Sequence, residues 1–534
     1  MYDYVIVGGG SGGATLAARL SEDPNVSICL LEAGGEGRGV LVRAPAGIMQ
    51  VGKSKAMNYA YETVPQAGLG GRIGYQPRGR GLGGSSAINA MLYLRGHRTD
   101  YDDWARLGCP GWGFDAVLPY FKRAEGNERG EDQLHGALGP LQVSEQQTPR
   151  GISSAFVDAA AQVGFPRNDD FNGADQEGVG LYQVTQFHGG ARNGERCSAA
   201  AAYLHPVMDR PNLTVLTETQ ALRVVLNSGR ATGVEVRCKT GTEIISATRE
   251  VILCGGAFNS PHLLMLSGIG DPAELTPHGI KVQHALPGVG KNLQDHLDFT
   301  LSWQSRETDM VGLSFRGIAQ LISAIGEWRK TGKGLIATPF AESGGFIKSS
   351  PDLDRPDLQL HFLIAMVDDH GRKRHWGFGY SCHVCVLRPK SRGTVGLASP
   401  DPTKAPRIDP NFLADPDDAA LLLAGVKQTQ KILAAPALAK YRYKELYKTE
   451  GQDDAVLMKQ IRARADTIYH PVGTCKMGTD AMAVVDPELR VHGVACLRVV
   501  DASVMPTLIG GNTNAPTIMI AERAADLIRA GARG

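Results

Sequence analysis

Hydrophobic positions near the N-terminus form two short apolar runs with a helical stretch between them. Residues 5–7 are continuously apolar, as in a buried strand, and six residues rich in glycine follow them. Residues 14–20 carry apolar side chains at helical spacing, residues 22–25 form a polar turn, and residues 26–31 are a second apolar run. This order predicts a strand, a helix and a second strand, the βαβ unit of a parallel sheet.

Later segments repeat both periodicities. Residues 212–216, 358–366, 381–387 and 394–397 have the composition of strands, whereas residues 517–530 form an amphipathic helical pattern. We find no internal repeat. The length of 534 residues and the hydrophobic content of 43 % are enough for two or three domains, each with its own core. The predicted class is α/β, and α+β overall.

Composition and charge exclude several classes of partner. The net charge of +1 provides no field that would attract nucleic acid. Nine scattered cysteines form no disulfide framework, which favours reduced thiols and a cytoplasmic location. The chain begins directly with a strand, so we expect no signal peptide. No run of 18 apolar residues predicts a membrane-spanning helix, and a peripheral contact at the inner membrane stays open.

Glycine is the most unusual feature of the composition. The chain has 66 glycines, whereas average usage would give about 37. The first cluster contains Gly8, Gly10 and Gly13 at the spacing GxGxxG, between a strand and a helix, and Glu32 lies at the end of the second strand. This context predicts binding of a dinucleotide, with the pyrophosphate at the helix N-terminus and Glu32 at the adenosine ribose. The irregular residues that follow Glu32 favour FAD over NAD.

Two later segments carry a resemblance to a known family. Residues 79–89 have the sequence GRGLGGSSAIN, and residues 256–270 have the sequence GAFNSPHLLMLSGIG. Both resemble the signatures of the glucose-methanol-choline (GMC) oxidoreductase family, and the resemblance extends through the N-terminal fingerprint and residues 469–522. In residues 256–270, a helix is expected to begin at Ser260-Pro261 and to end at Gly268 and Gly270.

The resemblance implies a Rossmann-like FAD-binding domain assembled from residues 1–150, 206–299 and 461–534. Residues 151–205 and 300–460 are expected to form a substrate-binding domain with an antiparallel sheet. The residues that the fingerprint and the resemblance assign to FAD are Gly8, Gly10, Ser11, Gly12, Gly13, Glu32, Leu82, Gly84, Ser85, Ser86, Asn89, Ala90, Met91, Leu92, Ala221, Tyr469, Asp501, Ala502, Asn512 and Thr513. Ile88 stands where relatives with covalent flavin carry histidine, so noncovalent FAD is expected.

The catalytic pair is also implied by the resemblance. Taken alone, His470 would more often be a structural histidine, but it matches the active-site histidine of the family. Asn512 matches the position of its partner, and Asn514 is expected to cap the helix that follows. His470 would accept the hydroxyl proton of an alcohol while a hydride passes to flavin N5, and Asn512 would bind the substrate oxygen.

The expected reaction is oxidation of a nonionic primary alcohol to the aldehyde, with electrons passed to a quinone or a similar acceptor. Choline dehydrogenase, an alcohol oxidase that forms hydrogen peroxide and a FAD-containing lyase remain alternatives. Glu342 is a candidate for binding a cationic head group, although we favour a structural carboxylate there. Cys382 and Cys385 have zinc-like spacing without a second pair, and no GxSxG motif supports a hydrolase. No metal is therefore expected.

Overall fold

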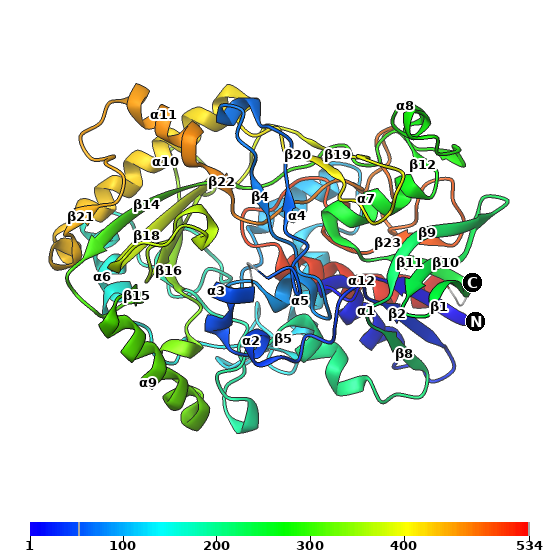
Figure 1. Cartoon of the computed structure of the whole chain (residues 1–534), viewed down its shortest axis with the longest axis horizontal. Helices are drawn as coiled ribbons and strands as arrows, with labels where there is room; N and C mark the ends of the chain where they lie inside the picture. Colours follow the sequence, from blue (N-terminus) through cyan, green and yellow to red (C-terminus); the bar gives the residue numbers. More distant parts are fainter. Residues whose placement is uncertain (52–53, 532–534) are drawn as a thin grey trace.

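Two large sheets organise the chain, one on each side of the molecule in Figure 1. The structure is a computed structural model that describes residues 1–51 and 54–531. A sheet with parallel strands lies on the right, near both ends of the described chain, and an antiparallel sheet lies on the left. Each sheet has its own large hydrophobic cluster. The mixed α/β class predicted from the sequence is confirmed.

The first sheet combines a parallel core with an antiparallel hairpin extension. Its strands are β1 (Tyr2–Val7), β2 (Ile28–Leu31), β8 (Leu213–Leu216), β9 (Gln220–Asn227), β10 (Arg230–Cys238), β11 (Gly241–Leu253) and β23 (Leu497–Val499). The end of β11 pairs in parallel with β1 and β23, while its beginning pairs antiparallel with β10. Strands β2 and β23 and the last four residues of β1 are buried, as expected for the centre of a sheet that is covered on both faces.

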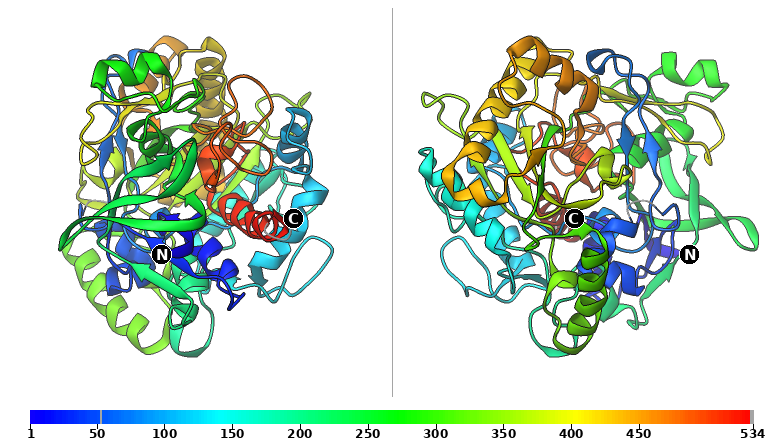
Figure 2. Two further views of the ribbon diagram at one scale, coloured as in Figure 1. Left: turned by 90° about the vertical axis from the view of Figure 1, so that its right-hand side faces the viewer. Right: turned by 60° about the vertical axis from the view of Figure 1, so that its left-hand side comes forward.

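Helices from both ends of the chain pack together beside this sheet. They are α1 (Ser11–Leu20), α5 (Phe114–Ala124) and the C-terminal α12 (Asn514–Gly531). Figure 2 shows α12, in red, running through the molecule beside the N-terminal elements, and α1 and α5 both contact it. Arg19 of α1 and Arg123 of α5 both form ion pairs with the fully buried Glu522 of α12. The two ends of the chain therefore build one wall of the fold.

The second sheet is antiparallel throughout. Its strands are β7 (Gly178–Leu181), β14 (Leu297–Ser305), β15 (Gly312–Leu313), β16 (Ala341–Ile347), β17 (Leu358–Leu363), β18 (Gly377–Val386), β21 (Lys444–Glu445) and β22 (Asp466–Thr467). Helices α6 (Gly151–Gln162) and α10 (Pro416–Ala434) contact its strands, while α9 (Phe315–Thr331) lies at the lower edge of the molecule in Figures 1 and 2.

The alternation of side chains across this sheet decides which residues face the site. On β17, Leu358, Leu360 and Phe362 join the hydrophobic cluster of the second sheet. Because side chains alternate along a strand, Gln359 and His361 point to the opposite face. The same alternation on β14 and β18 places polar side chains on that face. They are Asp298, Thr300, Ser302 and His383.

Three elements differ from the sequence prediction. Helix α7 (Gly256–Leu266) begins four residues before Ser260 and carries Pro261 inside it, because Gly256, with φ of +80°, allows an earlier turn. Helix α12 begins at Asn514, whose Oδ1 accepts a hydrogen bond from the Ser11 hydroxyl, so Asn514 is not the cap. Strand β19 (Thr394–Gly396) pairs only with β20 (Arg407–Asp409), outside the large antiparallel sheet.

Other helices are α2 (Val40–Arg43), α3 (Ile48–Val51), α4 (Arg98–Arg106), α8 (Pro272–Leu275) and α11 (Asp454–Arg464). Short strands pair outside the two large sheets: β3 (Tyr61–Glu62) with β4 (Tyr75–Gln76), β5 (Glu125–Asn127) with β6 (Leu141–Val143), and β12 (Ile269–Gly270) with β13 (His284–Ala285). In the described part of the chain, each helix is too short or too polar to cross a bilayer.

Candidate active site

A large cavity joins the carboxyl ends of the parallel strands to the polar face of the antiparallel sheet. Its volume is about 1870 Å³, whereas pockets for one small molecule are commonly about 300–1,000 Å³. Gly10 and Ser86 line one part, and Asp298 and His383 line another. The cavity therefore has room for a dinucleotide together with a second, smaller ligand.

The first glycine cluster is built for close approach. Gly8 has a φ of +105°, a conformation that favours glycine, and a side chain on Gly13 would lie only 1.9 Å from the Gly8 carbonyl oxygen. Gly10 differs, because a side chain there would meet only the Gly84 Cα, at 3.9 Å. No protein atom excludes a side chain at position 10, but the space in front of that residue belongs to the cavity. Gly10 thus keeps room open for a ligand at the N-terminus of α1.

Glu32 ties three glycine-containing segments together. Its carboxylate accepts hydrogen bonds from the backbone N–H groups of Gly9 (2.8 Å), Gly34 (2.8 Å) and Gly81 (2.9 Å). A side chain on Gly34 would lie 2.5 Å from the Gly81 nitrogen, so this close contact requires glycine. Burial raises the pKa of Glu32, although these three N–H groups oppose the shift. Glu32 therefore organises the loops and also lines the cavity.

Asp501 is satisfied by neutral donors rather than by a cation. One carboxylate oxygen accepts from the Gly256 N–H and the Ser260 hydroxyl, and the other accepts from the N–H and hydroxyl of Ser503. Burial raises the pKa of Asp501, while these hydrogen bonds oppose the shift. The Asp501 carboxylate therefore holds the start of α7 in place.

Most residues assigned to the cofactor from the sequence line this cavity. Gly13 and Leu82 do not: Gly13 lets α1 pack on β1, and Leu82 is a fully buried core residue beside Gly9. The cavity-lining members are Gly8, Gly10, Ser11, Gly12, Glu32, Gly84, Ser85, Ser86, Asn89, Ala90, Met91, Leu92, Ala221, Tyr469, Asp501, Ala502, Asn512 and Thr513.

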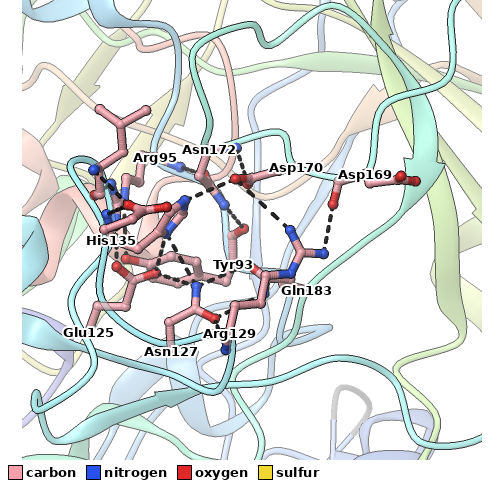
Figure 3. A network of polar contacts seen from close by, with 12 residues as sticks. Tyr93, Arg95, Glu125, Asn127, Arg129, His135, Asp169, Asp170, Asn172 and Gln183 are labelled. Carbon is pink, nitrogen blue, oxygen red and sulfur yellow. Dashed lines mark hydrogen bonds and ion pairs between the residues drawn. The ribbon is translucent and has the colours of Figure 1, made fainter.

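The segment that carries Asn89 to Leu92 is anchored by a buried polar network (Figure 3). The Arg95 N–H donates to Asn172, and the Arg95 guanidinium pairs with Glu125. His135 bridges Glu125 and Asp170 at 3.1 and 2.9 Å. Burial alone would lower the pKa of His135, but its bonds to Asp170 and Glu125 raise it to about 9. The network holds this wall of the cavity and does not line it.

His470 and Asn512 lie side by side in the cavity wall. The Asn512 Nδ2 atom is 3.1 Å from His470 Nε2, and both residues line the cavity. Gln359 of β17 donates its Nε2–H to Asn512 Oδ1 at 3.0 Å. The backbone N–H of His470 donates to Asp295 at 2.9 Å, and Asp295 also accepts from the Thr467 hydroxyl. Both side chains are therefore held from behind.

Hydrogen bonds fix the tautomer of His470. His296 Nε2 lies 2.9 Å from the Leu387 carbonyl oxygen, which can only accept, so this nitrogen carries a proton. The Nδ1 of neutral His296 must then accept from His470 Nδ1–H, at 3.0 Å. The remaining nitrogen of His470, Nε2, carries no proton, and its lone pair accepts from Asn512 Nδ2–H. The atom that faces the cavity is therefore a base.

Burial keeps these rings neutral. Burial lowers the pKa of His470 well below its ordinary value, and the neighbouring His296 and His361 lower it further. The pKa of His296 falls to about 4 for the same reason, burial. Removing an imidazole from water disfavours its charged form. Near neutral pH, His470 thus stays in the form that can accept a proton.

The antiparallel sheet contributes further polar groups that the sequence analysis did not identify. His383 Nδ1 lies 2.5 Å from Asp298 Oδ2, and His383 stands opposite His361 on the neighbouring strand. Within the described residues, Asp298 Oδ1 and His383 Nε2 are buried without a hydrogen-bond partner. Alternation along the expected strands 358–366 and 381–387 predicts the face of each histidine within its own strand, and the pairing of His361 with His383 then brings both to one face.

Glu342 lies in β16 and is not among the residues that line the cavity. Its carboxylate accepts from the Arg150 N–H and the Ser153 hydroxyl, both at 2.7 Å, and from the Thr338 hydroxyl at 2.8 Å. Burial raises the pKa of Glu342, and these donors oppose the shift. Asp298 on β14 of the same sheet does line the cavity.

The Cys382 and Cys385 thiols cannot share one metal ion through this strand. They are three residues apart on β18, so their side chains point to opposite faces. Cys382 packs in the core of the second sheet and Cys385 in a separate cluster. Burial raises the pKa of both thiols, which disfavours thiolate ligands.

The cavity fits FAD on two observations. The open space in front of Gly10, at the N-terminus of a ten-residue helix without a side-chain cap, suits a phosphate. Arg78 lines the cavity with its Nη1 bonded to the Tyr469 carbonyl, and its buried Nε and Nη2 have no partner among the described residues. Such donors suit a ligand that is rich in hydrogen-bond acceptors, as FAD is.

Comparisons with known proteins give a consistent result. The description "GMC oxidoreductase" belongs to both family models that match, one over residues 2–298 and the other over residues 389–521. The chain is 48 % identical over 532 residues to an alcohol dehydrogenase [acceptor] from Pseudomonas putida, covering 99 % of this chain and 96 % of that protein. It is 45 % identical over 541 residues to the mitochondrial choline dehydrogenase of Homo sapiens, covering 99 % and 90 %.

Solved structures share the fold over the full length. The crystal structure of pyridoxine 4-oxidase from Mesorbium loti has a TM-score of 0.89 at 32 % identity, covering 99 % of each chain. A formate oxidase has a TM-score of 0.92 at 27 % identity, covering 100 % of this chain and 98 % of that one.

Proposed function

The chain belongs to the GMC oxidoreductase family, and on this premise we propose that it uses FAD to oxidise a primary alcohol to the aldehyde. The observation that carries the proposal is the unprotonated His470 Nε2 beside the Asn512 amide, in a cavity with room for a dinucleotide and a small substrate. A base and an amide donor at one point are the two groups that a reacting hydroxyl needs.

The proton transfer follows from the tautomer of His470. A substrate hydroxyl that enters between the two side chains accepts from Asn512 Nδ2–H and donates its proton to His470 Nε2. The imidazolium that forms keeps its Nδ1–H bond to His296, so the ring does not turn. The alcohol loses this proton from oxygen and a hydride from carbon, which leaves the aldehyde. Both side chains are held from behind, which preserves the geometry during the reaction.

Bound FAD supplies the hydride acceptor for this oxidation. We propose that the cavity-lining residues of the glycine clusters, with Ala221, Asp501 and Ala502, hold it noncovalently. Ile88 lines the cavity and has no nucleophilic atom that could attach a flavin. Acid precipitation of the protein should therefore release the flavin into the supernatant.

For the acceptor, we propose a quinone or a similar compound rather than oxygen, and a cytoplasmic location. The similarity to an alcohol dehydrogenase [acceptor] supports the first proposal. A panel of alcohols assayed with a redox dye, and in parallel for hydrogen peroxide in air, tests it. Turnover with the dye and little peroxide is expected, whereas equal rates in air with peroxide would indicate an oxidase.

Choline is a second candidate substrate, favoured by the similarity to choline dehydrogenase and by Asp298, whose Oδ1 lacks a partner in the described structure. Against it, Asp298 Oδ2 is already engaged by His383. Choline and its neutral isostere 3,3-dimethylbutanol separate the two readings. If Asp298 binds the ammonium group, Asp298→Asn lowers kcat/KM for choline alone, whereas our primary proposal expects the isostere to be the better substrate.

The division into a cofactor part (1–150, 206–299 and 461–534) and a substrate part (151–205 and 300–460) also remains a proposal. The parallel strands fall within the first set. Strand β22 pairs with β14 of the antiparallel sheet, which favours moving the last boundary to a position after residue 467.

A further inference from the structure

Helix α9 carries two apolar faces, and the fold uses only one of them. Gly317 and Ala324 are buried against the body of the molecule, and Leu321 and Trp328 pack against the core of the second sheet. Phe315, Ile318, Ile322 and Ile325 recur at spacings of three and four residues on the other side, and all four are exposed. Phe315 is 84 % exposed and Ile322 is 67 % exposed.

This exposed stripe continues onto Trp376, which directly precedes β18, and it reaches the mouth of the cavity. Trp376 is 58 % exposed and packs edge-on against Phe315, with ring centroids 5.5 Å apart. Ile318 and Ile325 also line the cavity, so the outer surface and the cavity wall share residues. We call Leu313, Phe315, Ile318, Ile322, Ile325 and Trp376 the rim face.

Basic residues surround the rim face. Arg316, Arg329 and Lys330 lie on α9, and exposed Lys373 and Arg374 directly precede His375 and Trp376. In the described structure, none of these five forms an ion pair. The whole chain has a net charge of only +1, so this is a local excess. A protein partner of ordinary charge would not require so many unpaired cations around an apolar centre.

We infer that the rim face docks on an anionic phospholipid bilayer, with the mouth of the cavity turned toward the lipid. An amphipathic surface helix with aromatic and aliphatic residues on one side and Lys/Arg around them is the form of an interfacial membrane helix. Each basic side chain near an anionic surface adds about fivefold to binding. An apolar alcohol or acceptor dissolved in the bilayer would then enter the cavity without crossing water. This inference goes beyond the proposed reaction and does not depend on it.

Vesicle flotation of the FAD-loaded protein tests the inference. We expect the protein to float with vesicles of phosphatidylcholine and phosphatidylglycerol, and much less with phosphatidylcholine alone. The Phe315→Gln/Ile322→Gln variant should bind at least about tenfold more weakly. Arg316→Gln/Lys330→Gln should lose binding mainly to the anionic vesicles. Leu138→Gln is the matched control, because Leu138 is 94 % exposed and lies outside the rim face and the cavity lining; it should bind like the wild type.

Two results would overturn the inference. One is absence of flotation with anionic vesicles by wild-type protein that retains its flavin. The other is a dimer, measured by light scattering, that Phe315→Gln/Ile322→Gln dissociates while vesicle binding is absent, because a second copy of the chain would then cover the rim face. Since flotation needs no turnover, failure of the proposed reaction would leave this test intact.

Discussion

His470 donates its Nδ1–H to His296 Nδ1 across 3.0 Å, and this bond decides which nitrogen of His470 can act as a base. The Leu387 carbonyl oxygen sets the direction of this series of hydrogen bonds, because it can only accept the Nε2–H of His296. His296 stays neutral near pH 7, because its pKa is about 4, so its Nδ1 atom remains able to accept the hydrogen bond from His470. His296 is therefore a positioning residue for His470.

Replacing His470 with alanine removes the proposed base. General base catalysis is worth about 10²–10⁴-fold, so the rate of flavin reduction by an alcohol should fall by that range. FAD should stay bound, because the proposed phosphate contacts lie on other elements. Rapid mixing under anaerobic conditions measures the rate, and the flavin-to-protein ratio is the control. An unchanged rate would refute the assignment.

His296→Leu should slow flavin reduction without loss of FAD, because His470 loses the acceptor for its Nδ1–H and can adopt the other tautomer. The expected decrease is about 10–100-fold, by analogy with the loss of a hydrogen-bond partner that orients a metal-bound histidine. In His296→Gln, the side-chain oxygen can accept the same proton, so part of the rate should return. If the leucine and glutamine variants are equally slow, His296 has only a packing role.

Gly10→Val should abolish flavin retention while the protein stays folded. The φ of Gly10 is −75°, which a valine tolerates, and a Cβ atom meets no protein atom closer than 3.9 Å. The added methyl groups would instead fill the proposed phosphate space. Gly39→Val is the control, because Gly39 is exposed, has an ordinary φ of −63° and has no atom within 4 Å of an added Cβ. Purified Gly10→Val with a full flavin content would contradict this placement.

Buried neutral histidines make stability depend on pH on the acid side. The native pKa values of His262 and His296 are about 4, because burial disfavours the imidazolium, whereas an unfolded histidine titrates near 6.5. Below pH 6.5 the unfolded chain binds more protons, so the free energy of unfolding falls as the pH falls from 6.5 toward 4. Each group contributes about 1.4 kcal/mol per pH unit there.

Thermal unfolding at pH 7.5 and pH 5.5 checks this expectation. The melting temperature should be lower at pH 5.5, and the difference should shrink in His262→Gln, which removes one of these histidines. A wild-type melting temperature that does not change between the two pH values would contradict this expectation, because the folded and unfolded chains would then take up the same number of protons over that range.

The elements built from short periodic runs were predictable from the sequence. The strand, glycine turn and helix at residues 2–20 follow from local chemistry, and Glu32 directly follows β2, at the end of the second strand as expected. Its three backbone partners could not be predicted, because Gly9, Gly34 and Gly81 meet only in the folded chain. Close contacts that form only on folding also explain glycine at positions 34 and 344, since added side chains would meet residues 80–81 and Tyr182.

The residues that hold His470 and Asn512 in place could not be predicted from the sequence, for the same reason. Gln359, His296 and Asp295 come from segments 153–175 residues away from the residues that they hold. A lone histidine or glutamine has no periodic signal, and only sheet pairing brings these groups together. From the sequence, Glu342 is a candidate for binding a cationic head group, but a structural carboxylate is favoured. In the folded chain its carboxylate accepts hydrogen bonds from Arg150, Ser153 and Thr338.

The visible absorption of the bound flavin under anaerobic conditions tests the central claim most directly. Addition of a primary alcohol to the purified holoenzyme should bleach the band of oxidised flavin, because the alcohol delivers its hydride when His470 takes the hydroxyl proton. An oxidised spectrum that persists with every alcohol of a broad panel would contradict the account, and would instead point to a protein, such as a FAD-containing lyase, that binds the flavin without reducing it.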